Sequence, residues 1–277
     1  MGFRINTNVA SMTAQRAVGQ VNREQQDSLQ KLSSGSRINK ASDDAAGLAI
    51  SEKMKSEIRS ARQADRNAND GISMVQVAEG GLNEVQSILT RLRELAVQSA
   101  SDTVGDTERG FTNMEYQNLV QELDRISEVT EFNGQKLLNG EGDKLDFQIG
   151  TKADAKGNQI SYEVSAVNSS SNSLGIEGVE VASKQGALES LGSVDKAIEK
   201  VSGQRAFLGA MQNRLVSTSN NLQVGIENLS AANSRIRDVD YAEETAKSTK
   251  NGILQAAGTS VLSQANMNGQ SALKLIG

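Results

Sequence analysis

The side chains best suited to catalysis or metal binding in this chain are pairs of carboxylates. Asp43 and Asp44 are adjacent at a predicted helix start, and Asp238 and Asp240 flank Val239. An adjacent Asp pair without a third ligand is a poor metal site, and interaction with the helix dipole explains it better. Side chains two residues apart on a helix do not face each other, which argues against a shared role for Asp238 and Asp240.

The composition excludes most other catalytic chemistry. The 277 residues include no His, Cys, Pro or Trp. Without His and Cys, most metal sites, thiolate chemistry and catalytic triads are ruled out. The sequence also contains no phosphate-binding loop, dinucleotide fingerprint or nucleophile elbow. We therefore predict a protein that is not an enzyme and that has no catalytic residue, cofactor or metal.

Charge and hydropathy limit the partners. The formal net charge of −5 argues against nucleic acid. No run of 18 apolar residues exists, so we expect no membrane insertion. The first residues, MGFRINTNVASMTAQ, lack the apolar core of a secretory signal, which taken alone would indicate the cytoplasm. Aromatic residues make up only 3%, which suits long thin helices better than a thick core.

Both ends of the chain are predicted to form helices with sparse apolar stripes. Residues 251–277 carry Lys274 as their only charged side chain, and residues 4–33 have no charge between Arg4 and Arg16. A helix of this kind docks on its own domain or on other copies. Two such ends favour coiled-coil pairing with each other, with their remaining faces packed against neighbouring copies. Each helix alone should be largely disordered because its stripe is weak.

Between these ends, apolar residues recur at helical spacing in three stretches. The first runs from Asp43 to about Ser99, a shorter one covers 119–129, and the third covers 188–229. We expect Ser42 to cap the first helix and Gly134, in left-handed conformation, to end the second. A helix over 43–99 would be about 80 Å long. No compact domain needs a helix of that length, whereas a rod or filament does.

The period changes from helical to two within residues 144–165, which predicts one β-hairpin. The next segment, NSSSNS at 168–173, is predicted to be a flexible surface turn. Its hydroxyls could be glycosylated, on Ser169, Ser170 or Ser171. The whole pattern predicts a mainly α fold, with a long antiparallel helical rod or coiled coil, a β-hairpin on the tip side, and both termini as paired helices at the other end.

Several long motifs resemble bacterial flagellin, over nearly the whole chain. They are RINTNVASMTAQR (4–16), KLSSGSRINKASDDAAGLAISEKM (31–54), RNANDGISMVQVAEGGLNEVQSILTRLRELAVQSA (66–100), TEFNGQKLL (130–138), SRIRDVDYAEETA (234–246) and ILQAAGTSVLSQAN (253–266). The resemblance implies an inner terminal-helix domain of residues 1–42 plus 236–277 and an outer rod domain of 43–235. Flagellins often insert further domains where this chain has a short turn at 168–184, so it is similar to a minimal flagellin.

The resemblance also implies a function and a location. Flagellin is exported unfolded through the flagellar type III-like apparatus without a cleaved signal, and it polymerises into the extracellular filament that drives swimming. This implication replaces the cytoplasmic location inferred from the N-terminus. Implied partners are other copies of the chain, a flagellin export chaperone on the C-terminal segment, and the filament cap and hook-associated proteins. An alternative is a hook–filament junction or adaptor protein, which shares the terminal helices.

Two sets of contact residues follow from the resemblance. Packing between subunits through the inner domain implies a set of apolar side chains: Ile5, Val9, Met12, Leu29, Leu32, Leu254, Val261, Leu262 and Leu273. Recognition by the flagellin-sensing Toll-like receptor implies Arg91, Leu95 and Glu115, although Thr90 stands where the family usually has Gln. Packing in the apolar seam is a second explanation for Leu95.

Overall fold

The computed structural model describes residues 7–274, apart from the side chains of 155–156 and 268–274. The chain forms two compact units, residues 1–56 with 228–277 (unit 1) and residues 57–227 (unit 2). Two long helices, α2 (Ala45–Ala100) and α6 (Lys184–Arg237), contribute to both units. The domain boundary expected near 42 lies in the connection before α2, and the one expected near 236 lies in the last turn of α6.

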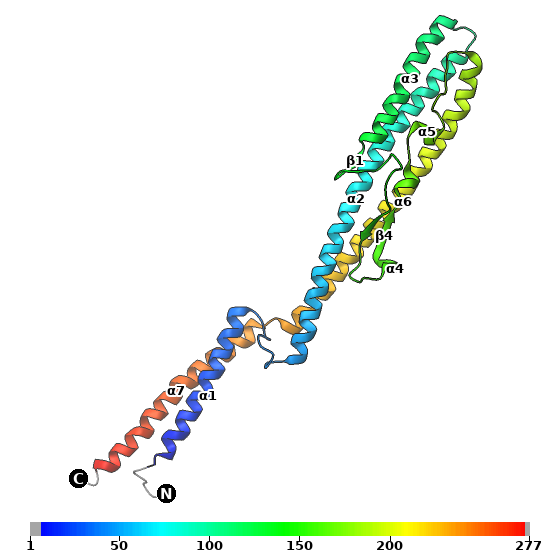
Figure 1. Ribbon diagram of the computed structural model, residues 1–277. Coiled ribbons are helices and arrows are strands. Elements are labelled where there is room, and N and C mark those ends of the chain that lie inside the picture. Colours follow the sequence, from blue (N-terminus) through cyan, green and yellow to red (C-terminus); the bar gives the residue numbers. More distant parts are fainter. Residues whose placement is uncertain (1–6, 275–277) are drawn as a thin grey trace. The chain divides into compact units, whose positions relative to one another are not determined.

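Unit 1 is built around an antiparallel pair of terminal helices, α1 (Val9–Ser34) and α7 (Tyr241–Lys274), which lie side by side (Figure 1). Helix α1 begins where the side chain of Asn8 accepts a hydrogen bond from Ser11 N, and it ends at Gly35 in left-handed conformation. Near the C-terminal end of α1, the hydroxyl of Tyr241, the first residue of α7, donates to Leu32 O at 3.1 Å. The predicted pairing of the two terminal helices is confirmed.

The connections that flank the terminal pair also bind each other. Arg37 N donates to Arg237 O at 2.6 Å, and Val239 N donates to Gly35 O at 3.0 Å. The prediction that Ser42 caps α2 is wrong, because the helix begins at Ala45 and the Asp44 carboxylate accepts from Gly47 N at 2.8 Å. Asp43 accepts from two backbone N–H groups in the preceding turn, and these hydrogen bonds lower the pKa of its carboxyl.

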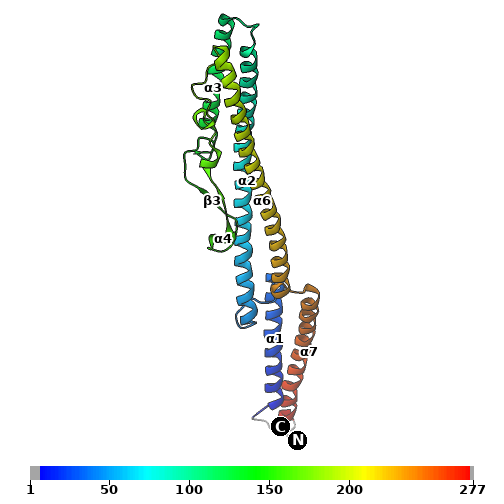
Figure 2. The same cartoon turned by 90° about the vertical axis from the view of Figure 1, so that its right-hand side faces the viewer.

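Unit 2 packs three helices together: the greater part of α2, α3 (Asp106–Val129) and the greater part of α6 (Figure 2). Their shared core is aliphatic, and its largest fully buried helical side chains are Leu82, Leu89, Leu92, Leu123 and Leu208, with Tyr116. Tyr116 reaches across the core, where its hydroxyl accepts a hydrogen bond from Ser190 Oγ at 3.0 Å. The apolar periodicity of the sequence therefore identified most of the helical core of this unit, although Val129 and Leu188, at the ends of two predicted stretches, are 58% and 50% exposed.

Two neighbouring glycines of α2 have opposite surroundings. A Cβ atom on Gly81 would lie 2.7 Å from Leu138 Cδ1 and 2.8 Å from Thr130 Oγ1, so the missing side chain allows the segment after α3 to approach closely. A Cβ atom on Gly80 would meet nothing within 4 Å. Of these two glycines, only Gly81 has a packing reason to be glycine.

A short hairpin that the sequence analysis missed follows α3. It pairs β1 (Glu131–Phe132) with β2 (Gln135–Lys136) around Asn133 and Gly134, both with positive φ. Asn-Gly with two positive φ angles is typical of a type I′ hairpin turn. The prediction that Gly134 ends the helix is therefore wrong, because α3 ends at Val129 and the glycine turns a hairpin instead.

The predicted hairpin is confirmed as β3 (Leu145–Gln148) paired with β4 (Gln159–Tyr162), in a register that sets Leu145 opposite Tyr162 and Phe147 opposite Ile160. The link between the strands includes the short helix α4 (Ala155–Asn158). Ile160 and Tyr162 are buried in the core of unit 2. Two short helices follow, η1 (Val164–Val167) and α5 (Ser171–Leu174).

Candidate assembly and recognition surfaces

The terminal helices present their large apolar side chains to solvent. Val261 is 60% exposed and Leu254 is 43% exposed in the described structure. The same holds along both helices, for Val9, Met12, Leu29, Ile253 and Met267. A few isolated apolar side chains on a surface are ordinary, but two adjacent helices with this many are typical of a surface that another protein covers.

The contact between α1 and α7 is made mostly by small and polar residues. Ser11, Ser28 and Asn251 are buried there, together with Ala265. Part of the apolar stripe of residues 251–277 lies beside α1, where Leu262 is half-buried and Ala265 is buried. The most enclosed side chains of the contact are small or polar, and most of the large aliphatic ones stay partly exposed.

An apolar groove of about 300 Å³ runs between these two helices. Its walls are Ala14, Ala17, Val18 and Val21 from α1, and Leu254, Ala257, Gly258 and Val261 from α7. The helices approach closely here, since a Cβ atom on Gly258 would lie 2.8 Å from Val18 Cγ2. The groove is lined only by small and aliphatic side chains, so its natural occupant is another apolar side chain.

Most of the predicted subunit contacts lie on this surface. Val9, Met12, Leu29, Leu254 and Val261 are exposed. Leu32 and Leu262 are half-buried. Ile5 and the side chain of Leu273 lie outside the described residues.

In unit 2, α2 and α3 are joined by an exposed charge cluster. The guanidinium of Arg91, on α2, donates a hydrogen bond to Glu115 Oε1, on α3, at 2.7 Å. It also donates to Glu94 Oε2, on its own helix, at 3.0 Å. These carboxylates raise the pKa of Arg91. Leu95 is only 2% exposed and belongs to the core, so packing in the seam explains it and direct receptor contact does not. The fold therefore brings together two of the three predicted receptor residues, Arg91 and Glu115.

The serine-rich segment at 168–173 is an ordered bridge between α3 and α6, and the predicted flexible surface turn is wrong. Ser171 N and Oγ both donate to the Asp124 carboxylate of α3, at 2.7 and 2.8 Å. Ser169 Oγ donates to Gln204 of α6, and Ser169 is fully buried. Ser170 is half-buried and its hydroxyl donates to Asn168. Burial removes Ser169 and Ser171 as accessible glycosylation sites.

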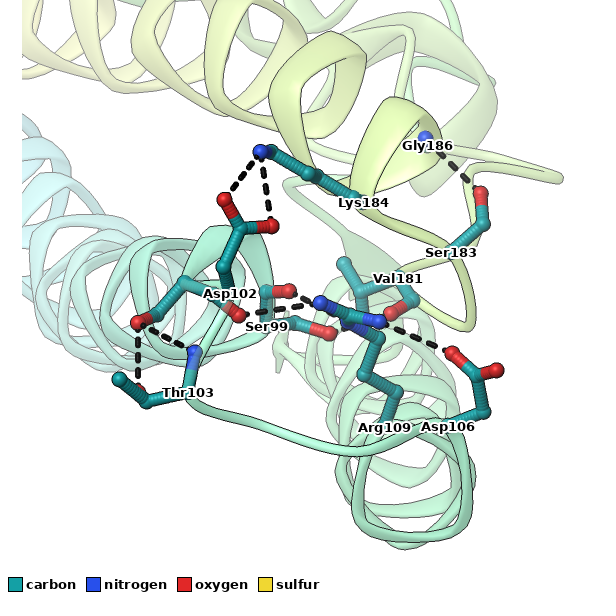
Figure 3. Close-up of polar contacts among 10 residues, drawn as sticks. Ser99, Asp102, Thr103, Asp106, Arg109, Val181, Ser183, Lys184 and Gly186 are labelled. Carbon is teal, nitrogen blue, oxygen red and sulfur yellow. Dashed lines mark hydrogen bonds and ion pairs between the residues drawn. The ribbon is translucent and has the colours of Figure 1, made fainter.

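The loop between α2 and α3 is organised by a buried arginine that the sequence analysis did not identify. Arg109 donates to Ser99 O at 2.9 Å and to Ser101 O at 3.0 Å, and it pairs with Asp106 (Figure 3). Ser99 Oγ donates in turn to Val181 O, just before α6. The signal that could have revealed this role is the Asp three residues before Arg109, a spacing at which two side chains of a helix meet.

A surface ion pair adds a second link at the same place. Lys184 Nζ lies 2.7 Å from Asp102 Oδ2, and this contact lowers the pKa of the Asp102 carboxyl (Figure 3). Ser183 caps α6 by accepting a hydrogen bond from Gly186 N at 3.1 Å. These contacts hold the α2–α3 loop and the start of α6 together.

Within residues 7–274 we find no group of three or more carboxylates that could hold a metal ion. In the same range, none of the helices combines the length and apolar character needed to cross a membrane.

Comparisons with known proteins give one consistent result. The family model described as the bacterial flagellin N-terminal helical region matches residues 5–143, and the model of the C-terminal helical region matches residues 191–276. The chain is similar to flagellin of Halalkalibacterium halodurans, with 44% identity over 98% of this chain and 99% of the relative. It is 43% identical to the flagellar filament 33 kDa core protein of Treponema phagedenis, over 98% of this chain and 99% of the relative.

Solved structures agree with this result. The crystal structure of Bacillus cereus flagellin, 28% identical, matches with a TM-score of 0.51 over 61% of this chain and 94% of that chain. A putative flagellar hook-associated protein from Vibrio parahaemolyticus shares the fold, with a TM-score of 0.59 at 14% identity. The full-length relatives and both family models are flagellins, so the chain belongs to the bacterial flagellin family.

Proposed function

We propose that this protein is the structural subunit of a flagellar filament outside the cell, and that it polymerises through its terminal helices. The observation that carries the proposal is the set of large aliphatic side chains that α1 and α7 turn outward, beside an apolar groove. Within one chain much of this apolar surface stays in water, since Ile253 is 66% and Val261 60% exposed. Covering them with neighbouring copies would remove them from water, and it would stabilise the terminal pair and the polymer together.

The same feature supports export before folding. The pair α1–α7 buries few apolar side chains, so it gains little stability from its own contacts. A chain end of this kind is easily kept unfolded during transport through a narrow channel. We propose that export through the flagellar apparatus removes no segment from the chain. The intact mass of filament protein would test this, and a mass below that of the full sequence would contradict it.

Other partners follow from particular surfaces. An export chaperone would bind the apolar face of α7, around Leu254 and Val261, before the pair forms. The filament cap and the hook-associated proteins would meet the same terminal helices at the two ends of the polymer. A flagellin-sensing Toll-like receptor would read the exposed Arg91 and Glu115 cluster. Arg91→Ala should then weaken receptor activation, whereas Arg93→Ala, an exposed arginine paired with Asp195, is the matched control.

Polymerisation itself is tested by placing a charge on the outward apolar face. Leu254→Asp should prevent sedimentable filaments, because an unpaired charge buried between copies costs several kcal/mol. The adjacent and more polar position provides the control, Gln255→Asp, since residue 255 is also exposed. Circular dichroism should show that unit 2 stays folded in both variants. Normal filaments from Leu254→Asp would contradict the proposed role of this face.

A further inference from the structure

The contact between α1 and α7 contains a group of buried polar side chains whose hydrogen bonds are incomplete. We call Gln25, Ser28, Glu244, Ser248 and Asn251 the polar seam cluster. One hydrogen bond crosses it, from Gln25 Nε2 to Ser248 Oγ at 3.0 Å. Four enclosed atoms, Gln25 Oε1, Ser28 Oγ, Glu244 Oε1 and Asn251 Nδ2, have no hydrogen-bond partner in the described part of the chain.

These side chains occupy positions where a helix pair usually places apolar residues. Ser28 is 1% exposed and Asn251 is 3% exposed. Glu244, Ser248 and Asn251 follow one another at steps of four and three on α7, and Gln25 and Ser28 lie three apart on α1, so each set shares one helix face. Burying polar groups without full hydrogen bonding is unfavourable, which weakens the pair compared with an apolar seam.

Polar contacts also keep a constant register along the pair. In an antiparallel pair of helices, the residue numbers of facing positions add to a constant. Three contacts share such a total, 273: Asn8 with Ala265, Gln25 with Ser248, and Leu32 with Tyr241. Many of the large aliphatic side chains, such as Val9, Leu29 and Ile253, are exposed and contribute little to holding this register. Sliding α7 by about one turn would break these hydrogen bonds. It would also bring a leucine, Leu254 or Leu262, to the place where Gly258 lies against Val18.

We propose that the polar seam cluster sets the register in which α1 and α7 pair, at the expense of the strength of that pairing in the free chain. A single buried polar residue in a helical seam acts in this way in coiled coils. The register matters because it fixes which aliphatic side chains of the two helices lie next to each other on the outer face. This inference deepens the proposed function, since it names the residues that prepare that face for neighbouring copies.

Disulfide cross-linking can measure the register, because the chain contains no cysteine of its own. Ser11 Oγ and Asn266 Oδ1 are 2.8 Å apart, so Ser11→Cys with Asn266→Cys reports the observed register. Ser11→Cys with Gly258→Cys, whose residue numbers add to four less than the total shared by the three contacts above, reports a pair displaced by one turn. Both reporters are combined with the native cluster, with Gln25→Leu plus Ser248→Ala, which removes the hydrogen bond across the cluster, and with the control Gln26→Leu plus Gln255→Ala, whose native residues are exposed on the same two helices.

With the native cluster, the first cysteine pair should form the intramolecular disulfide well in excess of the second. Loss of the cluster should lower that ratio about fivefold or more, since one hydrogen bond is worth about that factor. It should also raise the helix content of the free chain, whereas the control should change neither quantity. An unchanged ratio in the cluster variant, or an equal fall in the control, would overturn the proposal.

The ratio is measured in the free chain as well as in polymerised material, so it does not depend on filament formation. A chain with its native cluster that shows the expected ratio but never polymerises would contradict the proposed function and leave the register assignment standing. Filaments that form with no preference between the two cysteine pairs would contradict the register assignment and leave the proposed function standing.

Discussion

Replacing each of the adjacent glycines of α2 by alanine should have opposite effects on unit 2. Alanine is more favourable than glycine inside a helix by about 1 kcal/mol. At Gly80 nothing lies within 4 Å of the new Cβ, so Gly80→Ala should stabilise the unit by about that amount. At Gly81 the Cβ would lie 2.7 Å from Leu138 Cδ1, and Leu138 is fully buried and has no space to move into.

The second contact at Gly81 is equally constrained. Thr130 Oγ1, 2.8 Å from the new Cβ, donates to Ile126 O at 2.7 Å and would lose that bond by rotating away. Overpacking a well-packed core costs about 1–3 kcal/mol, which outweighs the helix gain. The two variants should therefore differ by about 2 kcal/mol, or about 4–8 °C in Tm for a unit of this size.

Thermal and urea unfolding of the two variants, followed by circular dichroism, measures this difference directly. The parent chain is the reference, and the two substitutions are identical in chemistry and adjacent in sequence. A stabilisation of similar size in both variants would refute the reasoning, because it would mean that the Leu138 and Thr130 contacts relax without cost. Equal destabilisation would also refute it, since it would place an unseen constraint at Gly80.

Three further predictions concern unit 2. Arg109→Met should lower the free energy of unfolding by about 3 kcal/mol in urea titrations, because two carbonyls lose a charged donor; Asp106→Asn should change little, since that carboxylate is 95% exposed. The pKa of the Asp102 carboxyl is lowered from 3.8 in the folded chain. The ion pair of Asp102 with Lys184 therefore stabilises the unit above pH 3.8, and this stabilisation is lost as the pH falls through the lower pKa of the folded state. A urea midpoint that rises on acidification below pH 3.8 would contradict this. Asp124→Asn should speed amide exchange at Ser171 about tenfold, because one of its two acceptor oxygens becomes a donor.

The long helices and the larger hairpin could be predicted from the sequence because their signals are local. Apolar residues at helical spacing over 43–99 and 188–229, and alternation over 144–165, each repeat many times within one element. The end of α3 could not be predicted from the same signals. Asn133-Gly134 suits a helix end as well as a hairpin turn, and only the pairing of Phe132 with Gln135 decides between them.

The direction of the apolar side chains of α7 could not be predicted, for a different reason. Periodicity identifies which side chains of α7 share a face, but it does not say whether that face meets α1 or solvent. Leu254 and Val261 stay predicted subunit contacts, and the structure adds that both are exposed. The prediction of a flexible turn at 168–173 was wrong for a related reason. A run of Ser and Asn has low apolar content whether or not its side chains hydrogen-bond to the rest of the fold. Its partners, Asp124 and Gln204, are distant in the sequence.

The outward apolar face of α1 and α7 has a consequence for the kinetics of growth. Ordering a helix pair costs conformational entropy, and neighbouring copies supply most of the apolar burial that offsets this cost. A pair of copies free in solution covers only part of each face, so the first few subunits of a new filament gain least. Nucleation should accordingly be slow and show a lag that added filament fragments remove. Subunits at high concentration inside a cell would then remain monomeric until they reach an existing filament end.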